Sequence, residues 1–169
     1  VDHVVRALAL LLEQGCEAEL SIIGWGQDQW RLEAQVNELG LSGAVTFAGR
    51  LDDAEKNAEL QQAHLLLHTS MREGWGLNVI EANAMGTPAV VYPVGGLVDS
   101  TVHGQTGLVS EAETPESLAK AVIGLANCPE KYDAMRTAAW KRSFDFRWES
   151  VLPPTCDWLE NMARDTEPV

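Results

Sequence analysis

The stretch LLLHTSMREGWGLNVIEANAMGTPAVVYPVGG, residues 65–96, decides the fold of this chain. It begins with an apolar run at 65–68, passes through a glycine-containing turn into a helical pattern at 76–85, and reaches a second apolar run at 89–92 after the turn Gly86-Thr87-Pro88. Short apolar runs that alternate with helices of about ten residues are typical of parallel βαβ units. The stretch therefore predicts a parallel sheet flanked by helices.

The regions on either side extend this pattern. Residues 20–40 and 45–62 each contain an apolar run, a glycine and a helical pattern, as expected of two further strand–helix units. The C-terminal third contains only helical patterns, and we expect the Pro153-Pro154 pair to interrupt the last of them. The sequence thus predicts one α/β domain over residues 1–165 and a frayed tail at 166–169.

Composition limits the possible functions. A chain of 169 residues, 46% of them hydrophobic, can bury the core of a single domain. The formal net charge of −13 argues against attraction of nucleic acid or anionic lipid by bulk charge, so any bound phosphate must be met locally. Three widely spaced cysteines indicate neither a disulfide framework nor a metal site. No apolar run approaches the roughly 20 residues of a membrane span, and we expect a cytoplasmic protein.

Three turns after predicted strands are candidate ligand sites, because open parallel sheets bind ligands at the carboxyl ends of their strands. The first, Gly24-Trp25-Gly26, is either a generic tight turn or a ligand contact. The second is MREGWGLN at 71–78. The third is Val94-Gly95-Gly96-Leu97, with Asp99 close behind, where the glycine pair either admits a sugar or phosphate or only makes a sharp connection.

The second turn combines the features of an anion site. Its two glycines flank Trp75 and allow close approach of the backbone, and the amides of residues 76–79 would face a ligand at the positive end of the following helix. Glu73 lies in the turn and Glu81 about one and a half helical turns further on, so we expect them to have different roles. The alternative is that Glu73 only favours the helix N-terminus and Glu81 is solvated.

Taken in order, five motifs resemble the donor domain of the group 1, or family 4, glycosyltransferases: GWG at 24–26, VTFAGRL at 45–51, REGWGLNVIEANAMGTPAVV at 72–91, GG at 95–96 and GQTGLV at 104–109. The resemblance covers nearly the whole chain and depends most on the two glutamates of the third motif. It implies a Rossmann-like parallel sheet with flanking helices, the C-terminal half of a two-domain GT-B fold. It also implies a retaining enzyme of the hexosyltransferase type that uses a UDP- or GDP-type sugar donor and needs no metal or other cofactor.

The resemblance further implies roles for single residues. Glu73 would be the catalytic carboxylate that faces the donor sugar, and Glu81 would bind the ribose hydroxyls. Backbone amides of the turn between them would meet the sugar and the diphosphate, at Gly74, Trp75, Gly76, Leu77 and Asn78. Arg50 and Leu51 would lie beside the base. The other donor contacts would be Gly24, Gly26, Gly95, Gly96 and Asp99, of which Asp99 stands where many members carry glutamate.

The sequence departs from the family pattern in two places. Trp75 stands where phenylalanine is commoner, which keeps a flat apolar wall. The chain opens at Val1 inside a helical pattern, and the family's preceding strand, with its Gly-Arg and the lysine that follows, is not in the sequence. We therefore expect a piece of a longer protein, a gap at the centre of the sheet and weak donor affinity. The acceptor-binding N-terminal domain would be its partner, and the chain alone would be inactive.

Other readings stay open. A GT-B-type sugar-nucleotide epimerase would use other acid and base residues, a non-catalytic nucleotide-binding module would bind without transfer, and an oxidoreductase would require GWG to be a dinucleotide-binding loop. His64 and His68 would share one face of a strand, but we find no further metal ligands near them and interpret both as structural. We interpret His103 as a solvated turn residue.

Overall fold

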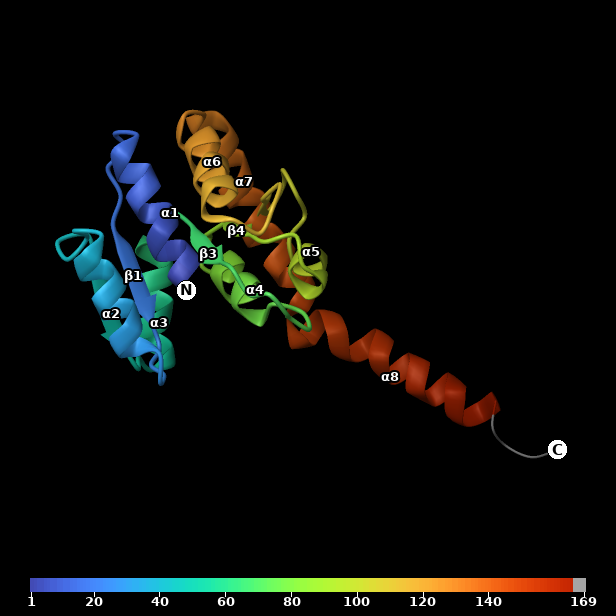
Figure 1. Cartoon of the computed structure of the whole chain (residues 1–169). Coiled ribbons are helices and arrows are strands. Elements are labelled where there is room, and N and C mark those ends of the chain that lie inside the picture. The colour runs from blue at the N-terminus through green and yellow to red at the C-terminus, as the bar shows by residue number, and fades with distance from the viewer. Residues whose placement is uncertain (166–169) are drawn as a thin grey trace.

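The computed structural model describes residues 1–165, so the predicted tail at 166–169 lies outside the described residues. Its elements alternate between strands and helices up to β5 and are helical after it (Figure 1), in this order: α1 (Asp2–Glu13), β1 (Leu20–Ile23), α2 (Gln29–Glu38), β2 (Val45–Gly49), α3 (Asp53–Gln62), β3 (Leu66–His68), α4 (Leu77–Ala84), β4 (Ala89–Val91), α5 (Gly95–Ser100), β5 (Gly107–Val109), α6 (Pro115–Ala126), α7 (Pro129–Ser143), the 3₁₀ helix η1 (Phe144–Phe146) and α8 (Trp148–Asp165). Every strand pair is parallel, which confirms the predicted α/β class.

The strands form two sheets instead of one. β1 pairs with β2, and β3, β4 and β5 form the other sheet in that order. Leu20 lies opposite Val45 in the first sheet, and Leu66 lies opposite Ala89 in the second. Within residues 1–165 no strand joins β1 to β3, so the sheet has the gap that the family pattern predicts.

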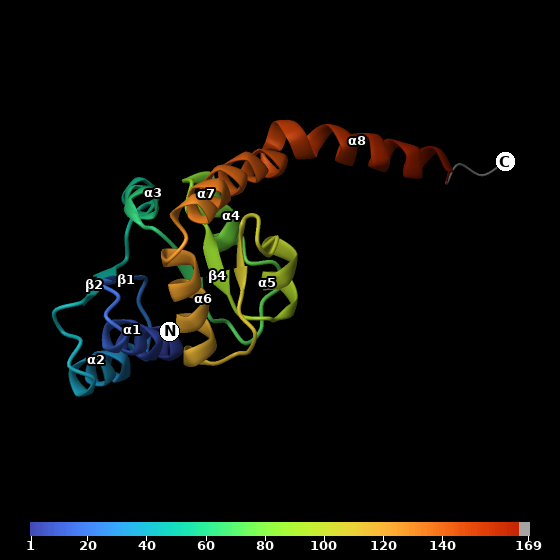
Figure 2. The ribbon, with the colours of Figure 1, turned by 90° about the horizontal axis from the view of Figure 1, so that it is seen from above.

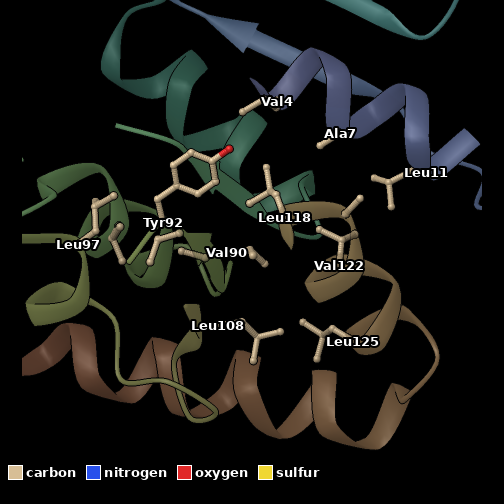
Figure 3. Close-up of a cluster of buried hydrophobic side chains, with 14 of the residues drawn as sticks. Val4, Ala7, Leu11, Val90, Tyr92, Leu97, Leu108, Leu118, Val122 and Leu125 are labelled. Atoms are coloured by element: carbon tan, nitrogen blue, oxygen red, sulfur yellow. The ribbon is translucent and has the colours of Figure 1, made fainter. Parts of the chain in front are cut away.

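Helix α1 links the two sheets because two of its faces are buried. One face packs against α6 and the three-stranded sheet, in a core that includes Val4, Leu11, Val90, Leu118 and Leu125 (Figures 2 and 3). Its other face joins a second core beneath β1 and β2, formed by Val5, Leu8, Val36 and Leu41. Full burial of one such side chain contributes roughly 1.5–3 kcal/mol, so the helix, more than any strand pairing, holds the halves together.

Tyr92, directly after β4, extends from the sheet toward α1 (Figure 3). Its hydroxyl lies 2.8 Å from Nδ1 of His3, which gives the buried polar group a partner. Burial raises the pKa of Tyr92 to about 12. Tyr92 therefore remains protonated and serves as an interior link between β4 and α1.

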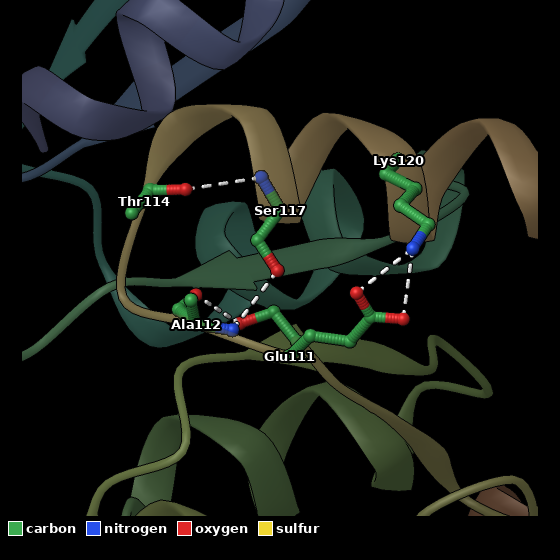
Figure 4. A network of polar contacts seen from close by, with 6 residues as sticks. Glu111, Ala112, Thr114, Ser117 and Lys120 are labelled. Carbon is green, nitrogen blue, oxygen red and sulfur yellow. Dashed lines mark hydrogen bonds and ion pairs between the residues drawn. The ribbon is translucent and has the colours of Figure 1, made fainter.

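The helix starts follow local capping chemistry. Thr114 Oγ1 accepts from the Ser117 amide at 3.2 Å (Figure 4), and Pro115 occupies the first turn of α6. Asp52 and Glu55 form a reciprocal capping box at the start of α3. These helices thus begin where their sequences specify.

Two predictions about elements are wrong. Helix α8 runs through Pro153 and Pro154 without interruption. Its residues 148–164 are exposed, so water can satisfy the carbonyls that lose an amide partner. The Gly95-Gly96 pair begins helix α5 instead of forming a free turn, and β5 has no counterpart among the predicted strands.

Helix α8 extends away from the rest of the chain (Figure 1). It begins with the exposed Trp148, which has 73% of its surface accessible. Within the described residues, no helix combines the length and the apolar character needed to cross a membrane.

Candidate functional site

Two of the three predicted turns meet at the carboxyl ends of β3 and β4. The segment after β3 carries Glu73, and α5 begins shortly after β4. Because these strands are parallel neighbours, their carboxyl ends lie at the same edge of the sheet. The Gly96 amide donates to the Glu73 carbonyl at 3.2 Å, which joins the two turns directly.

Glycine is required where the turns touch. A Cβ at Gly96 would lie 2.3 Å from the Gly74 carbonyl carbon and 2.4 Å from the Trp75 nitrogen. Gly76 caps α4 with a φ of +77°, and a Cβ there would lie 2.9 Å from Ser100 Oγ. The Glu73 turn therefore packs backbone to backbone against α5, an approach that side chains larger than hydrogen would prevent.

The carboxylate of Glu73 has a neighbour at each oxygen. Oε1 accepts from the Gly74 amide at 3.2 Å, and Oε2 lies 3.6 Å from Nε2 of His68. The His68 side chain is only 14% exposed, and this burial lowers its pKa, against the smaller opposing effect of the Glu73 charge. His68 is thus mainly neutral at pH 7 and leaves the negative charge on Glu73 in place.

Glu81 is paired with a lysine from another helix. Its Oε2 lies 3.1 Å from Nζ of Lys56 on α3, and Nζ also lies 3.3 Å from Oδ1 of Asp53. The hydrogen bond that Lys56 donates to Glu81 is the largest cause of a raised pKa at Lys56. The interpretation of Glu81 as merely solvated is therefore incomplete, although its side chain is 46% exposed.

The N-terminal end of α4 is open to solvent. Leu77 and Asn78 are exposed, and their amides belong to the first turn, where a helix presents N–H groups and its positive dipole end. The prediction that the Val79 amide faces a ligand is wrong, because this amide donates to the Gly76 carbonyl at 2.9 Å. An anion at this end would meet the earlier amides of the turn.

An aromatic contact supports the turn from the C-terminal side. The ring of Trp75 lies 5.7 Å from the ring of Phe146, centroid to centroid, and the Arg142 guanidinium lies 5.2 Å from the Phe146 centroid. Arg142 also donates to the backbone carbonyls of Ser100 and Asp99. A cation at the C-terminal end of α5 is electrostatically favourable, so α7 and η1 hold both the turn and α5.

The remaining predicted site residues lie in less constrained positions. Gly24, Gly26, Arg50 and Leu51 are at the carboxyl ends of β1 and β2, in the other sheet, and the Gly24 amide donates to the Gly49 carbonyl at 2.7 Å. Arg50 is exposed and Leu51 half-buried. The Asp99 side chain and Gly95 are both exposed. A Cβ added at Gly95 would have no heavy atom within 4 Å.

Sequence reasoning missed two neighbours of the glutamates, His68 and Lys56. His68 ends β3, directly before the turn, and its position in the chain is the only signal that could have connected it with Glu73. Lys56 precedes Glu81 by 25 residues and carries no local signal of the pairing. His103, in contrast, has a structural role, because its Nδ1 accepts from the Val109 amide at 2.9 Å.

Other potential sites contribute little. Among residues 1–165, no group of three or more His, Cys, Asp or Glu side chains is placed to hold a metal ion. A hollow of about 350 Å³ between α1 and α6 is lined by apolar side chains such as Leu10 and Ile123, by the polar Gln14, Glu116 and Lys120, and by none of the predicted site residues. The strand-end turns are therefore the candidate site.

The fold defines this chain as a Rossmann-like α/β domain, with its candidate site at the carboxyl ends of parallel strands. The sequence model described as "Glycosyl transferases group 1" matches residues 1–142. The chain belongs to this family.

Named relatives agree with this assignment. The chain is 33% identical over 156 residues to the glycogen synthase of Mycobacterium tuberculosis (strain CDC 1551 / Oshkosh), covering 92% of this chain and 38% of the relative. It is 31% identical over 162 residues to the poly(glycerol-phosphate) alpha-glucosyltransferase of Bacillus subtilis (strain 168), covering 95% of this chain and 23% of the relative. The chain thus spans well under half the length of these two relatives.

Solved structures show the same fold. Sucrose-phosphate synthase from Thermosynechococcus elongatus superimposes with a TM-score of 0.82 at 24% identity, over 97% of this chain and 43% of that one. HepE from Anabaena, solved in complex with UDP, superimposes with a TM-score of 0.80 at 23% identity, over 96% of this chain and 44% of that one.

Proposed function

We propose that this chain binds the nucleotide-sugar donor of a retaining glycosyltransferase and that the complete protein transfers the sugar to an acceptor. The observation that carries the proposal is the junction of the Glu73 turn with α5, beside the exposed start of α4. HepE from Anabaena was solved with UDP and with UDP-glucose, which supports a donor of this chemical class.

The proposed roles follow from the charges of the transfer reaction. Positive charge develops at the anomeric carbon and negative charge on the departing diphosphate, and preorganised groups that face these charges lower the barrier. The Glu73 carboxylate would stabilise the first charge, with the neutral His68 beside it. The amides at the start of α4, from Leu77 and Asn78, would stabilise the second.

Nucleotide recognition would involve the other predicted residues. Glu81 would accept hydrogen bonds from the ribose hydroxyls, and Arg50 and Leu51, just before α3, would lie beside the base. We propose that the acceptor is bound by a separate N-terminal domain, in keeping with the greater length of the relatives. We also propose that the reaction needs no metal, since the amides and the helix end supply the electrostatic stabilisation.

The test uses the complete protein and three ligands: UDP, GDP and NAD. Ligand binding to the native state raises the unfolding temperature, so we expect a rise with UDP or GDP and none with NAD. Glu81→Gln should weaken binding of that nucleoside diphosphate. Glu73→Gln should leave this binding intact and lower sugar transfer from the nucleotide sugar by about 100-fold, the scale of losing one preorganised electrostatic contact.

The matched control is Glu111→Gln, because Glu111 forms an exposed ion pair with Lys120 at 2.8 Å (Figure 4) and is not among the predicted site residues. It should change neither binding nor transfer. NMR of the product should show the anomeric configuration of the donor, and EDTA should not reduce the rate. No response to either nucleoside diphosphate would refute the proposal, and binding without transfer would instead favour a non-catalytic module.

A further inference from the structure

We infer that Lys56 is a positioning residue for Glu81 and thereby sets the affinity of the site for the ribose of the donor nucleotide. This inference rests on the proposed function, in which Glu81 binds the ribose hydroxyls. Lys56 lies outside the family motifs quoted above, and only the packing of α3 against α4 brings it to the site.

The contact joins two helices that belong to different parts of the proposed donor site. Lys56 lies in the first turn of α3, which begins directly after the segment proposed to lie beside the base, and Glu81 lies in the second turn of α4. Nζ and Oε2 are 3.1 Å apart, a charge-assisted hydrogen bond. The exposed Asp53, on the same helix, also lies 3.3 Å from this ammonium group through Oδ1.

The Lys56 side chain is more enclosed than that of an ordinary surface lysine, although its ammonium group stays close to solvent. Its side chain is 29% exposed, whereas that of Lys120, in the pair with Glu111, is 69% exposed. The hydrogen bond with Glu81 also raises the pKa of Lys56, so the ammonium group is charged throughout the physiological range. The contact is therefore available whenever a donor binds.

The contact acts on one oxygen of the carboxylate. Lys56 engages Oε2 of Glu81, which leaves Oε1 to accept from a ribose hydroxyl. A free glutamate on a helix surface samples several rotamers, and fixing such a side chain on binding costs roughly 0.5–1.5 kcal/mol. A contact from a second helix removes part of this cost before the nucleotide arrives.

A purely structural role makes a different prediction. Exposed ion pairs contribute about 0–1 kcal/mol to stability, so removal of Lys56 would then change the unfolding temperature slightly and affect all ligands alike. A positioning role instead affects only ligands that have ribose hydroxyls. This difference decides the design of the test.

The test measures dissociation constants in the complete protein by calorimetry, for UDP or GDP, whichever binds, and for its 2′,3′-dideoxy analogue. We expect Lys56→Met to weaken binding of the normal nucleotide by about fivefold, the equivalent of roughly 1 kcal/mol, and to leave the dideoxy analogue unchanged. Lys56→Arg should restore most of the affinity. Lys120→Met removes the same charge from the comparison pair and should change neither constant.

A double mutant shows whether Lys56 acts through Glu81. With Glu81→Gln already present, Lys56→Met should cause no further loss, because the partner of the lysine is gone. Three results would each overturn the inference. Lys56→Met could weaken binding of the dideoxy analogue as much as binding of the normal nucleotide, the losses of affinity in the double mutant could be additive, or Lys56→Met could leave the dissociation constant unchanged. If Glu81→Gln itself leaves nucleotide affinity unchanged, the proposed ribose role fails, and this result differs from a failure of the Lys56 role alone.

Discussion

Replacing Gly96 by alanine should separate the Glu73 turn from α5. The added Cβ would lie 2.3 Å from the Gly74 carbonyl carbon and 2.5 Å from its oxygen, and backbone atoms cannot move aside as a flexible side chain can. Overpacking of this kind costs roughly 1–3 kcal/mol. For a domain of this size each kcal/mol lowers the melting temperature by about 2–4 °C, so the domain should melt about 2–12 °C lower.

Gly95→Ala is the matched control for stability. A Cβ at Gly95 would meet nothing within 4 Å, and both glycines are in α5. Replacement of a helical glycine by alanine should stabilise by about 0.5–1 kcal/mol where there is space. Thermal unfolding of both variants in the complete protein measures the difference. If Gly96→Ala melts at or above the temperature of Gly95→Ala, the inferred backbone contact is wrong.

Three further changes test the supports of the site and the fold by thermal unfolding. Burial lowers the pKa of His68, so below the usual histidine pKa of 6.5 the unfolded chain binds more protons than the folded chain. Stability should therefore fall as the pH drops from about 7 to 5. The change His68→Gln should flatten that dependence, whereas the change His64→Gln, at an exposed histidine, should not. Arg142→Met should destabilise by about 1–3 kcal/mol, because two backbone carbonyls at the end of α5 lose a charged donor; an unchanged melting temperature would contradict this. Thr114→Ala should cost about 1 kcal/mol through loss of the α6 cap, whereas Thr137→Ala, inside α7, should cost less; equal losses would refute the capping argument.

Local sequence signals predicted most of the fold. The apolar runs marked β1 to β4, and Thr114 and Asp52 fixed the starts of their helices through side-chain caps. These features depend on hydrophobic period and hydrogen bonds within a few residues, which a sequence displays directly. The predicted interruption at Pro153-Pro154 was wrong, because the cost of losing two amide donors depends on solvent exposure, which the sequence does not show.

The candidate site could be predicted only in part. The turn at 71–78, with Glu73 inside it and Glu81 beyond it, is visible in the sequence, and the roles of these residues stay predictions. The two glycines of the third turn look equivalent in the sequence, but only Gly96 touches the backbone of the Glu73 turn. That difference arises because β3 and β4 are parallel neighbours, which brings segments about 20 residues apart into contact.

By itself, the sequence determined the α/β class and the family, and it named the residues of the candidate site. The tertiary structure decided how those residues are held: His68 beside Glu73, Lys56 beside Glu81, and Gly96 against the turn. The reason is physical. Propensity, periodicity and capping act over a few residues along the chain, whereas the environment of a carboxylate depends on which helices and strands pack around it, and packing is a property of the whole fold.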